Sequence, residues 1–140
     1  MGRISKHFSQ AEFDCKCGCS CEMIVSSDLL KILEEIRICV GEPIKVLSGH
    51  RCEEHNRSVG GASQSWHLLR NHSLLASDIT YWDPEKRTHF NALRLYVAAD
   101  RLGASGLGLY GGNTPRVHVD KRPTKRARWL HSSWNWDAAV

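Results

Sequence analysis

The chain has 140 residues, of which 41% are hydrophobic and 24% charged, and its formal net charge is +4. A chain of this size and composition folds alone, so we expect one domain over residues 1–140 that needs no metal or disulfide for bulk stability. No apolar run approaches the roughly 18 residues of a transmembrane helix, so we expect no such helix. The opening MGRISKHFSQAEF has no apolar stretch, so we expect no secretory signal, synthesis in a cytoplasm and no membrane partner.

The first part of the chain predicts two helices. Ser9 and Glu12 form an S-x-x-E capping box, which predicts a short helix over residues 10–14. A longer helix is predicted over residues 27–40, and Gly41 ends it. The apolar residues of this segment recur at helical spacing: Leu29, Leu33, Ile36 and Val40.

The middle of the chain predicts strands around a polar, irregular region. The β-branched stretch 44–47 predicts a strand, and one helical turn is expected near residues 53–57. Residues 76–82 return to strand character. Asp83 precedes a proline, which predicts the cap of a helix that runs to about Leu102.

Two late segments complete the predicted fold. Residues 107–110 and 116–120 are typical of short strands joined by a Gly-Gly-Asn turn. Helices and clustered short strands together indicate an α+β protein with a small antiparallel sheet and helices packed on one side.

The cysteines are unusual for a chain made in a cytoplasm, because four of the six alternate as CKCGCSC and the other two stand apart. Zinc sites more often show C-x-x-C spacing, and alternating thiols share one face only in an extended segment. Three interpretations stay open: free thiols in a loop, a structural metal site, and disulfides formed after export. The residues concerned are Cys15, Cys17, Cys19, Cys21, Cys39 and Cys52.

Three residues have the chemistry of a catalytic zinc site, which takes three protein ligands and keeps a further position for water. His67 precedes the strand that carries Asp78, and His118 lies in the strand RVHVD. Alternation along that strand puts His118 and Asp120 on one face and the two valines on the core face. Taken singly, each of these residues also has an ordinary structural explanation.

Several blocks of sequence resemble one family in the right order. SGHRCEEHNRSVGGASQSWH followed by LASDI resembles the central SGxR, S-x-H and A-x-D signature of the LAS zinc peptidases, which include D-Ala-D-Ala carboxypeptidases and L-Ala-D-Glu endopeptidases. FSQAEFDCKCGC, GLGLY with VHVDKRP, and the later ARW resemble the phage-type members. The resemblance covers nearly the whole chain and implies the fold shared by D-Ala-D-Ala peptidases and hedgehog domains.

The resemblance also implies the site. By it, zinc is bound by His67, Asp78 and His118, polarises a peptide carbonyl and lowers the pKa of its bound water. Arg51 would stabilise the developing oxyanion, and Ser65 would help to hold the substrate or the loop.

The spacing departs from the family pattern, in which seven positions and a glycine separate the first histidine from the aspartate. Here eleven positions separate His67 from Asp78, without a glycine. We interpret this as a four-residue insertion at 70–73. His72 is the rival ligand, but no serine lies two residues before it.

The usual general base is also missing. Relatives carry an acidic residue three positions before the last ligand or a histidine two before it, where this chain has Pro115 and Arg116. Asp120, on the face of His118, is the candidate base or ligand-orienting partner.

These observations predict a monomeric zinc peptidase that cleaves the peptide part of bacterial peptidoglycan, as a carboxypeptidase or an endopeptidase such as a phage endolysin, and that reaches the wall if released. The alternative is a non-catalytic zinc-containing binding module of the same fold. A zinc-stabilised nucleic-acid binder has less support, so we expect no specific nucleic acid partner. The late basic run suits an anionic wall: Lys121, Arg122, Lys125, Arg126 and Arg128.

Overall fold

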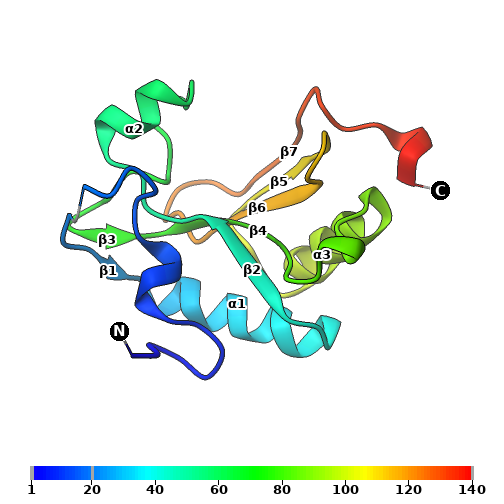
Figure 1. Cartoon of the computed structure of the whole chain (residues 1–140), viewed down its shortest axis with the longest axis horizontal. Helices are drawn as coiled ribbons and strands as arrows, with labels where there is room; N and C mark the ends of the chain where they lie inside the picture. Colours follow the sequence, from blue (N-terminus) through cyan, green and yellow to red (C-terminus); the bar gives the residue numbers. More distant parts are fainter. Residues whose placement is uncertain (1, 20, 140) are drawn as a thin grey trace.

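The computed structural model describes residues 2–19 and 21–139. It is a mixed α+β fold built on a five-stranded sheet with the strand order β2-β4-β6-β5-β7 (Figure 1). Neighbouring strands are antiparallel except β5 and β7, which are parallel. The strands are β2 (Ile44–Ser48), β4 (Ala76–Tyr81), β5 (Gly106–Tyr110), β6 (Arg116–Asp120) and β7 (Ala127–Leu130).

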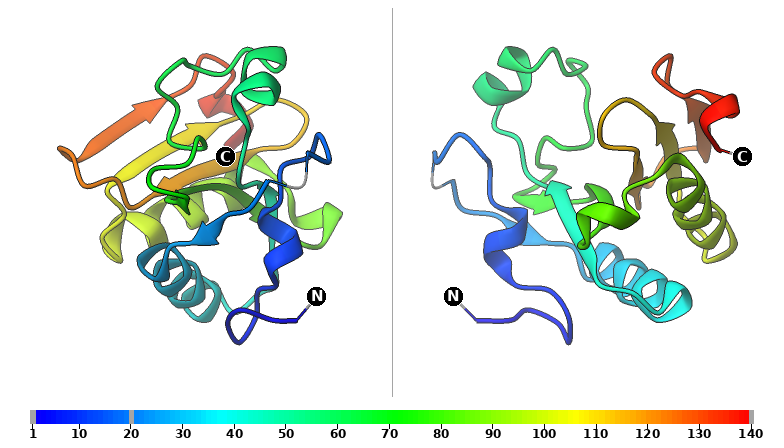
Figure 2. Two further views of the ribbon diagram at one scale, coloured as in Figure 1. Left: turned by 90° about the vertical axis from the view of Figure 1, so that its left-hand side faces the viewer. Right: turned by 45° about the vertical axis from the view of Figure 1, so that its right-hand side comes forward.

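Two helices, α1 (Ser27–Val40) and α3 (His89–Arg101), pack on one face of the sheet, whereas the short α2 (Glu53–Ser58) lies on the opposite side (Figures 1 and 2). The core lies between α1, α3 and the sheet, where alternate strand residues point toward the helices. Its buried side chains include Leu29, Leu33, Ile36, Ile79, Leu95, Leu107, Leu109, Val117 and Val119. Burial of both β6 valines leaves His118 and Asp120 for the other face.

The helix boundaries follow from local capping. The predicted first helix is the 3-10 turn η1 (Gln10–Phe13), and its capping box is present. Helix α1 begins where the Ser26 hydroxyl accepts hydrogen bonds from two backbone amides, and it ends at Gly41 with a left-handed φ of 70°. Both helices were predicted, and the structure confirms them.

The predicted helix from Asp83 to about Leu102 is two elements. Asp83 caps only the short 3-10 turn η2 (Pro84–Lys86), and Thr88 caps α3 instead. Arg87 breaks the continuity, because its guanidinium donates hydrogen bonds to the carbonyls of Tyr81 and Trp82 at the end of β4. This contact holds the turn against the sheet.

The other strand pairs of the five-stranded sheet are antiparallel, as predicted, but strand β7 was not predicted and it pairs with β5 in parallel. A second, two-stranded parallel sheet joins β1 (Ile24–Val25) to β3 (Ser73–Leu74). It ties the N-terminal segment to the chain just before β4. No helix of the described residues is long and apolar enough to cross a membrane.

One row of paired residues crosses the sheet on the face away from α1 and α3. In it Ser48 pairs with Asp78, Asp78 with His118, His118 with Gly108, and Gly108 with Trp129. The indole of Trp129 lies over Gly108, where a Cβ atom would collide with the ring. Glycine at this position therefore lets Trp129 approach His118, with ring centroids 5.2 Å apart.

The close approach predicts that Gly108→Ala destabilises the protein by about 1–3 kcal/mol, because the added methyl must displace the indole. Urea unfolding measures this change. Gly2→Ala is the control, because nothing lies within 4 Å of a Cβ atom there. Equal stability of Gly108→Ala and the unmodified protein would contradict the packing described.

Candidate metal centre

Three potential metal ligands meet on the open face of the sheet. His67 Nε2 and His118 Nδ1 each lie 3.2 Å from Oδ1 of Asp78. One ligand atom from each of the three residues lies within 4.8 Å of the others. All three residues are buried, with exposed fractions of 3% to 8%. The structure thus brings together the two strand residues and the loop residue that the sequence nominated.

The other nitrogen of each imidazole is already committed to an acceptor. Nδ1 of His67 donates to the carbonyl of Gly49 at 2.7 Å, and Nε2 of His118 donates to the carboxylate of Asp120 at 2.7 Å. Each histidine therefore presents its remaining nitrogen to Asp78. Without a proton or a cation between them, acceptor atoms would face one another in a buried site. A divalent metal would be bound by all three of these acceptor groups, the two imidazole nitrogens and the Asp78 carboxylate, so the donor set fits zinc.

Arg51 extends the charged cluster. Its Nη2 lies 3.4 Å from Oδ2 of Asp78, while Ser48 and Asn56 accept hydrogen bonds from its other nitrogens. Asn56 is itself buried and donates to the carbonyl of Ala62, so the guanidinium is held from two sides. Burial would raise the pKa of Asp78, but the neighbouring histidines His67 and His118 outweigh it and keep that pKa well below its ordinary value.

Asp120 is fully buried, and both oxygens of its carboxylate accept hydrogen bonds. Besides His118 it accepts hydrogen bonds from the backbone amide and the guanidinium of Arg122, the shortest at 2.6 Å. Burial would raise the pKa of Asp120, yet these hydrogen bonds lower it below its ordinary value. Of the two roles considered for Asp120, the geometry favours orientation of His118 over general base catalysis.

Ser65 shapes the loop that delivers His67. Its hydroxyl accepts a hydrogen bond from the amide of His67 at 3.1 Å, and its carbonyl accepts one from Arg70. Of the two roles expected for Ser65, the contacts support holding the loop. Arg70 also lies over the ring of Trp66, 4.3 Å from its centroid, so the loop is fixed by several contacts.

The segment that we interpret as an insertion forms a tight hairpin. Arg70 and Ser73 exchange both backbone hydrogen bonds at 2.9 Å. The residues between them, Asn71 and His72, have positive φ angles of 50° and 64°, as a type I′ turn requires. The turn carries the extra residues away from the sheet while His67 keeps its place beside Asp78.

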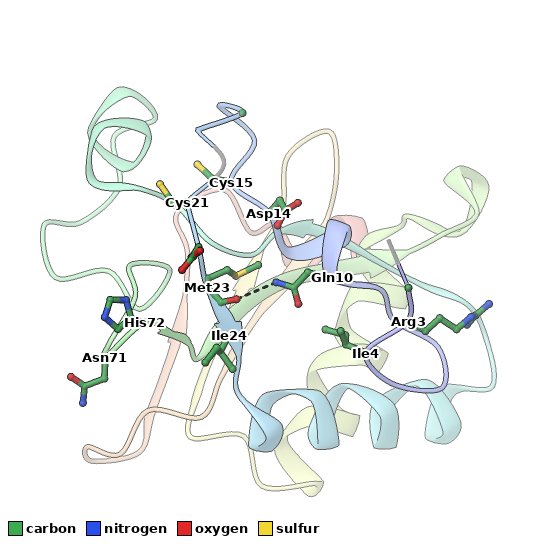
Figure 3. Close-up of a pocket in the computed structure, with 13 residues that line it drawn as sticks. Arg3, Ile4, Gln10, Asp14, Cys15, Cys21, Met23, Ile24, Asn71 and His72 are labelled. Atoms are coloured by element: carbon green, nitrogen blue, oxygen red, sulfur yellow. Dashed lines mark hydrogen bonds between the residues drawn. The ribbon is translucent and has the colours of Figure 1, made fainter.

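His72 therefore lies outside the metal centre. It is exposed and lines a pocket of about 1030 Å³ between the N-terminal segment and the hairpin. Figure 3 shows His72 and Asn71 on one side of this pocket and Gln10 and Arg3 farther along it. None of the three candidate ligands, His67, Asp78 and His118, lines it.

Sequence reasoning missed the residues that support the ligands. Asn56 holds Arg51, the Gly49 carbonyl holds His67, and Trp129 packs on His118. Nothing in the sequence around Asn56 indicated that its side chain would hold Arg51. The alternation Gly106-Leu-Gly108 was a usable signal, because glycines on one strand face mark a close approach.

Three of the five cations in the basic run 121–128 form ion pairs within the protein. Arg126 and Arg128 both form ion pairs with Asp100, and Arg122 pairs with Asp120. These pairs neutralise part of the charge locally, so the segment attracts an anionic surface less strongly than five unpaired cations would.

A buried His-Asp-His set on an α+β sheet, with each histidine oriented by a second acceptor, defines a protein able to bind a metal such as zinc. The family comparison agrees. The family model described as Peptidase M15 matches residues 6–120, well over half of the chain. The chain therefore belongs to the M15 peptidase family, whose members are zinc-dependent. A search of curated proteins finds no match.

The hydrogen bond from His118 predicts that Asp120→Asn weakens zinc binding by about 10- to 100-fold, because the imidazole loses its charged orienting partner. Competition with a chelator of known affinity measures the change. Asp100→Asn is the matched control, since that carboxylate forms ion pairs with Arg126 and Arg128 and is not part of the His67–Asp78–His118 group. Unchanged affinity in Asp120→Asn would contradict the orienting role.

The choice between the two loop histidines is tested directly. His67→Ala should lower the zinc content by one ion per chain, whereas His72→Ala should leave it unchanged, because only His67 faces Asp78. Elemental analysis after gel filtration gives both values. Loss of the ion in His72→Ala alone would overturn the assignment.

Proposed function

We propose that the protein is a zinc-dependent peptidase that cleaves the peptide part of bacterial peptidoglycan, as a carboxypeptidase or an endopeptidase. The observation that carries the proposal is the convergence of His67, Asp78 and His118 in a chain of the M15 peptidase family. The resemblance of its sequence blocks to LAS peptidases supports the substrate class.

The residues would divide the work. When bound, zinc supplies a Lewis acid that polarises a peptide carbonyl and makes water nucleophilic at neutral pH. Asp78 and the two histidines would hold it, with His118 kept in one orientation by Asp120. Arg51, fixed by Ser48 and Asn56 beside Asp78, would donate to the oxygen that becomes negatively charged.

A second candidate function is a binding module that keeps zinc without turnover. Two observations favour it. The carboxylate of Asp120 already accepts hydrogen bonds from Arg122 and His118. The places of the usual base hold Pro115 and Arg116. On this alternative the centre would bind a peptide through the same zinc and Arg51.

Mass spectrometry of purified peptidoglycan after incubation with the protein separates the two candidates. The peptidase should release a defined product that disappears with a chelator and returns with added zinc. Loss of a terminal D-Ala would identify a carboxypeptidase, and cleavage after L-Ala an endopeptidase. His118→Ala is the inactive control. A folded, zinc-loaded protein that releases nothing would favour the binding module.

Arg51→Ala should retain zinc but lower kcat by about 100- to 1000-fold, as removal of a single oxyanion donor does. Zinc should stay because Arg51 contacts Oδ2 of Asp78, whereas the histidines face Oδ1. The guanidinium is also held by Ser48 and Asn56. Arg57→Ala, an exposed arginine on the adjacent helix α2, should keep the full rate. An unchanged kcat in Arg51→Ala would refute its role.

A further inference from the structure

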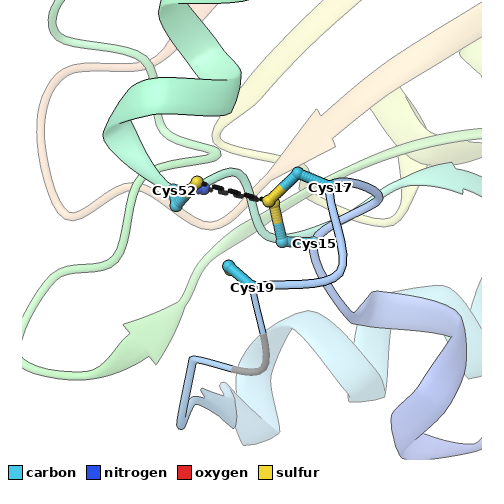
Figure 4. Close-up of side chains that lie close together, drawn as sticks. All are labelled: Cys15, Cys17, Cys19 and Cys52. Atoms are coloured by element: carbon cyan, nitrogen blue, oxygen red, sulfur yellow. Dashed lines mark hydrogen bonds between the residues drawn. The ribbon is translucent and has the colours of Figure 1, made fainter.

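A second cluster of metal-ligating side chains lies outside the His-Asp-His centre. The sulfur atoms of Cys15, Cys17, Cys19 and Cys52 lie within 4.8 Å of one another. Three of these residues come from the N-terminal CKCGC segment, and Cys52 immediately precedes α2 (Figure 4). Thirty-seven positions separate Cys52 from Cys15, so the fold alone creates the group.

The sulfur spacing suits a tetrahedral metal. Sγ of Cys52 lies 3.8 Å from that of Cys15 and 3.6 Å from that of Cys17. Tetrahedral zinc with Zn–S bonds of about 2.3 Å separates its sulfur ligands by about 3.8 Å. Sγ of Cys15 and Cys17 are 3.2 Å apart, and Sγ of Cys19 lies within 4.8 Å of the other three, so metal binding would move these thiols to an even spacing.

The backbone explains why a C-x-C spacing can still surround one point. The segment is not extended, because the amide of Gly18 donates to the carbonyl of Cys15 and closes a turn. Gly18 has a φ of 76°, a conformation that favours glycine. The turn curls the thiols of Cys15, Cys17 and Cys19 around a common centre instead of alternating them across a strand.

Two of the sulfur atoms accept hydrogen bonds from backbone amides. The amide of Cys52 donates to Sγ of Cys15, and the amide of His55 donates to Sγ of Cys52, both at 3.4 Å. Such hydrogen bonds favour thiolate ligands and fix their direction, as outer-shell partners do in metal sites.

We propose that Cys15, Cys17, Cys19 and Cys52 form a second, structural zinc site. It is closed, because four protein ligands leave no position for water, in contrast to the three-ligand centre on the sheet. Cys21 and Cys39 stay outside it. The thiol of Cys21 lies 3.0 Å from that of Cys19 but is not part of the group of four, and Cys39 is exposed on α1.

The site would fasten the N-terminal segment to the loop that serves the catalytic centre. Cys52 follows Arg51 directly, and Gly49 supplies the carbonyl that orients His67. The amide of His50 donates to the carbonyl of Phe13 at 2.8 Å, so the two segments already touch. Zinc at the thiolates would make this contact rigid and thereby position Arg51.

Metal content tests the proposal without any measurement of turnover. Protein purified with zinc under reducing, oxygen-free conditions should hold two ions per chain. Cys17→Ser and Cys52→Ser should each lower the content to one, and Cys17 is exposed, so its replacement leaves the core intact. Cys39→Ser, the matched control, should keep two ions, and His118→Ala should keep the thiolate-bound one.

Cobalt(II) substitution identifies the ligands. The sulfur-to-cobalt charge-transfer absorption should persist in His118→Ala and Cys39→Ser and vanish in Cys17→Ser. Absence of this absorption from the unmodified protein, with all six thiols open to alkylation, would overturn the site. Thiols that resist alkylation until reduction would overturn it as well, in favour of disulfides.

Hydrogen exchange tests the coupling to the loop. Cys17→Ser should lose protection in peptides that cover residues 13–19 and 49–58, while peptides of β4 and β6 stay unchanged. Equal exchange in Cys17→Ser and Cys39→Ser would show that the cluster does not hold the Arg51 loop.

Discussion

The carboxylate of Asp78 is buried between two imidazoles and a guanidinium, and the rest of the site is arranged around it. A buried charge is costly unless partners compensate it. Here the partners come from three different parts of the chain: the loop after β2, the loop before β4, and strand β6. The fold must bring these parts together for the carboxylate to remain charged, and this requirement links sheet register to chemistry.

The sheet meets that requirement through its two faces. Val117 and Val119 anchor β6 in the core against the helices, which fixes the direction of His118 on the opposite face. Gly106 and Gly108 of β5 leave space there for the Asp120 carboxylate and the Trp129 indole. Rigid ligands therefore result from ordinary strand alternation combined with two glycines.

Much of this was predictable from local pattern. The periodic apolar residues of α1, the strand RVHVD and the shared face of His118 and Asp120 all depend on short-range geometry. The start of α3 could not be predicted in this way. Arg87 donates a hydrogen bond to the carbonyl of Tyr81 at the end of β4, and the helix begins only after Thr88. Strand β7 was missed because its four residues, Ala-Arg-Trp-Leu, are too few to show an alternating pattern, and they form a strand only by pairing with β5.

The site likewise has a part that the sequence predicted and a part that it did not. Residue chemistry and family resemblance nominated the three ligands, and a type I′ turn at Asn71 and His72 explains how a longer spacing still delivers His67. The supporting contacts of Asn56 and the Gly49 carbonyl, like the approach of Cys52 to the N-terminal cysteines, depend on tertiary contacts between distant segments. No sequence pattern reports such contacts.

Zinc binding by His67, Asp78 and His118 can be tested with a crystal structure of the zinc-loaded protein and anomalous diffraction at the zinc edge. An anomalous peak should lie within bonding distance of His67 Nε2, the Asp78 carboxylate and His118 Nδ1. A zinc-loaded crystal with no peak among these three residues would contradict it.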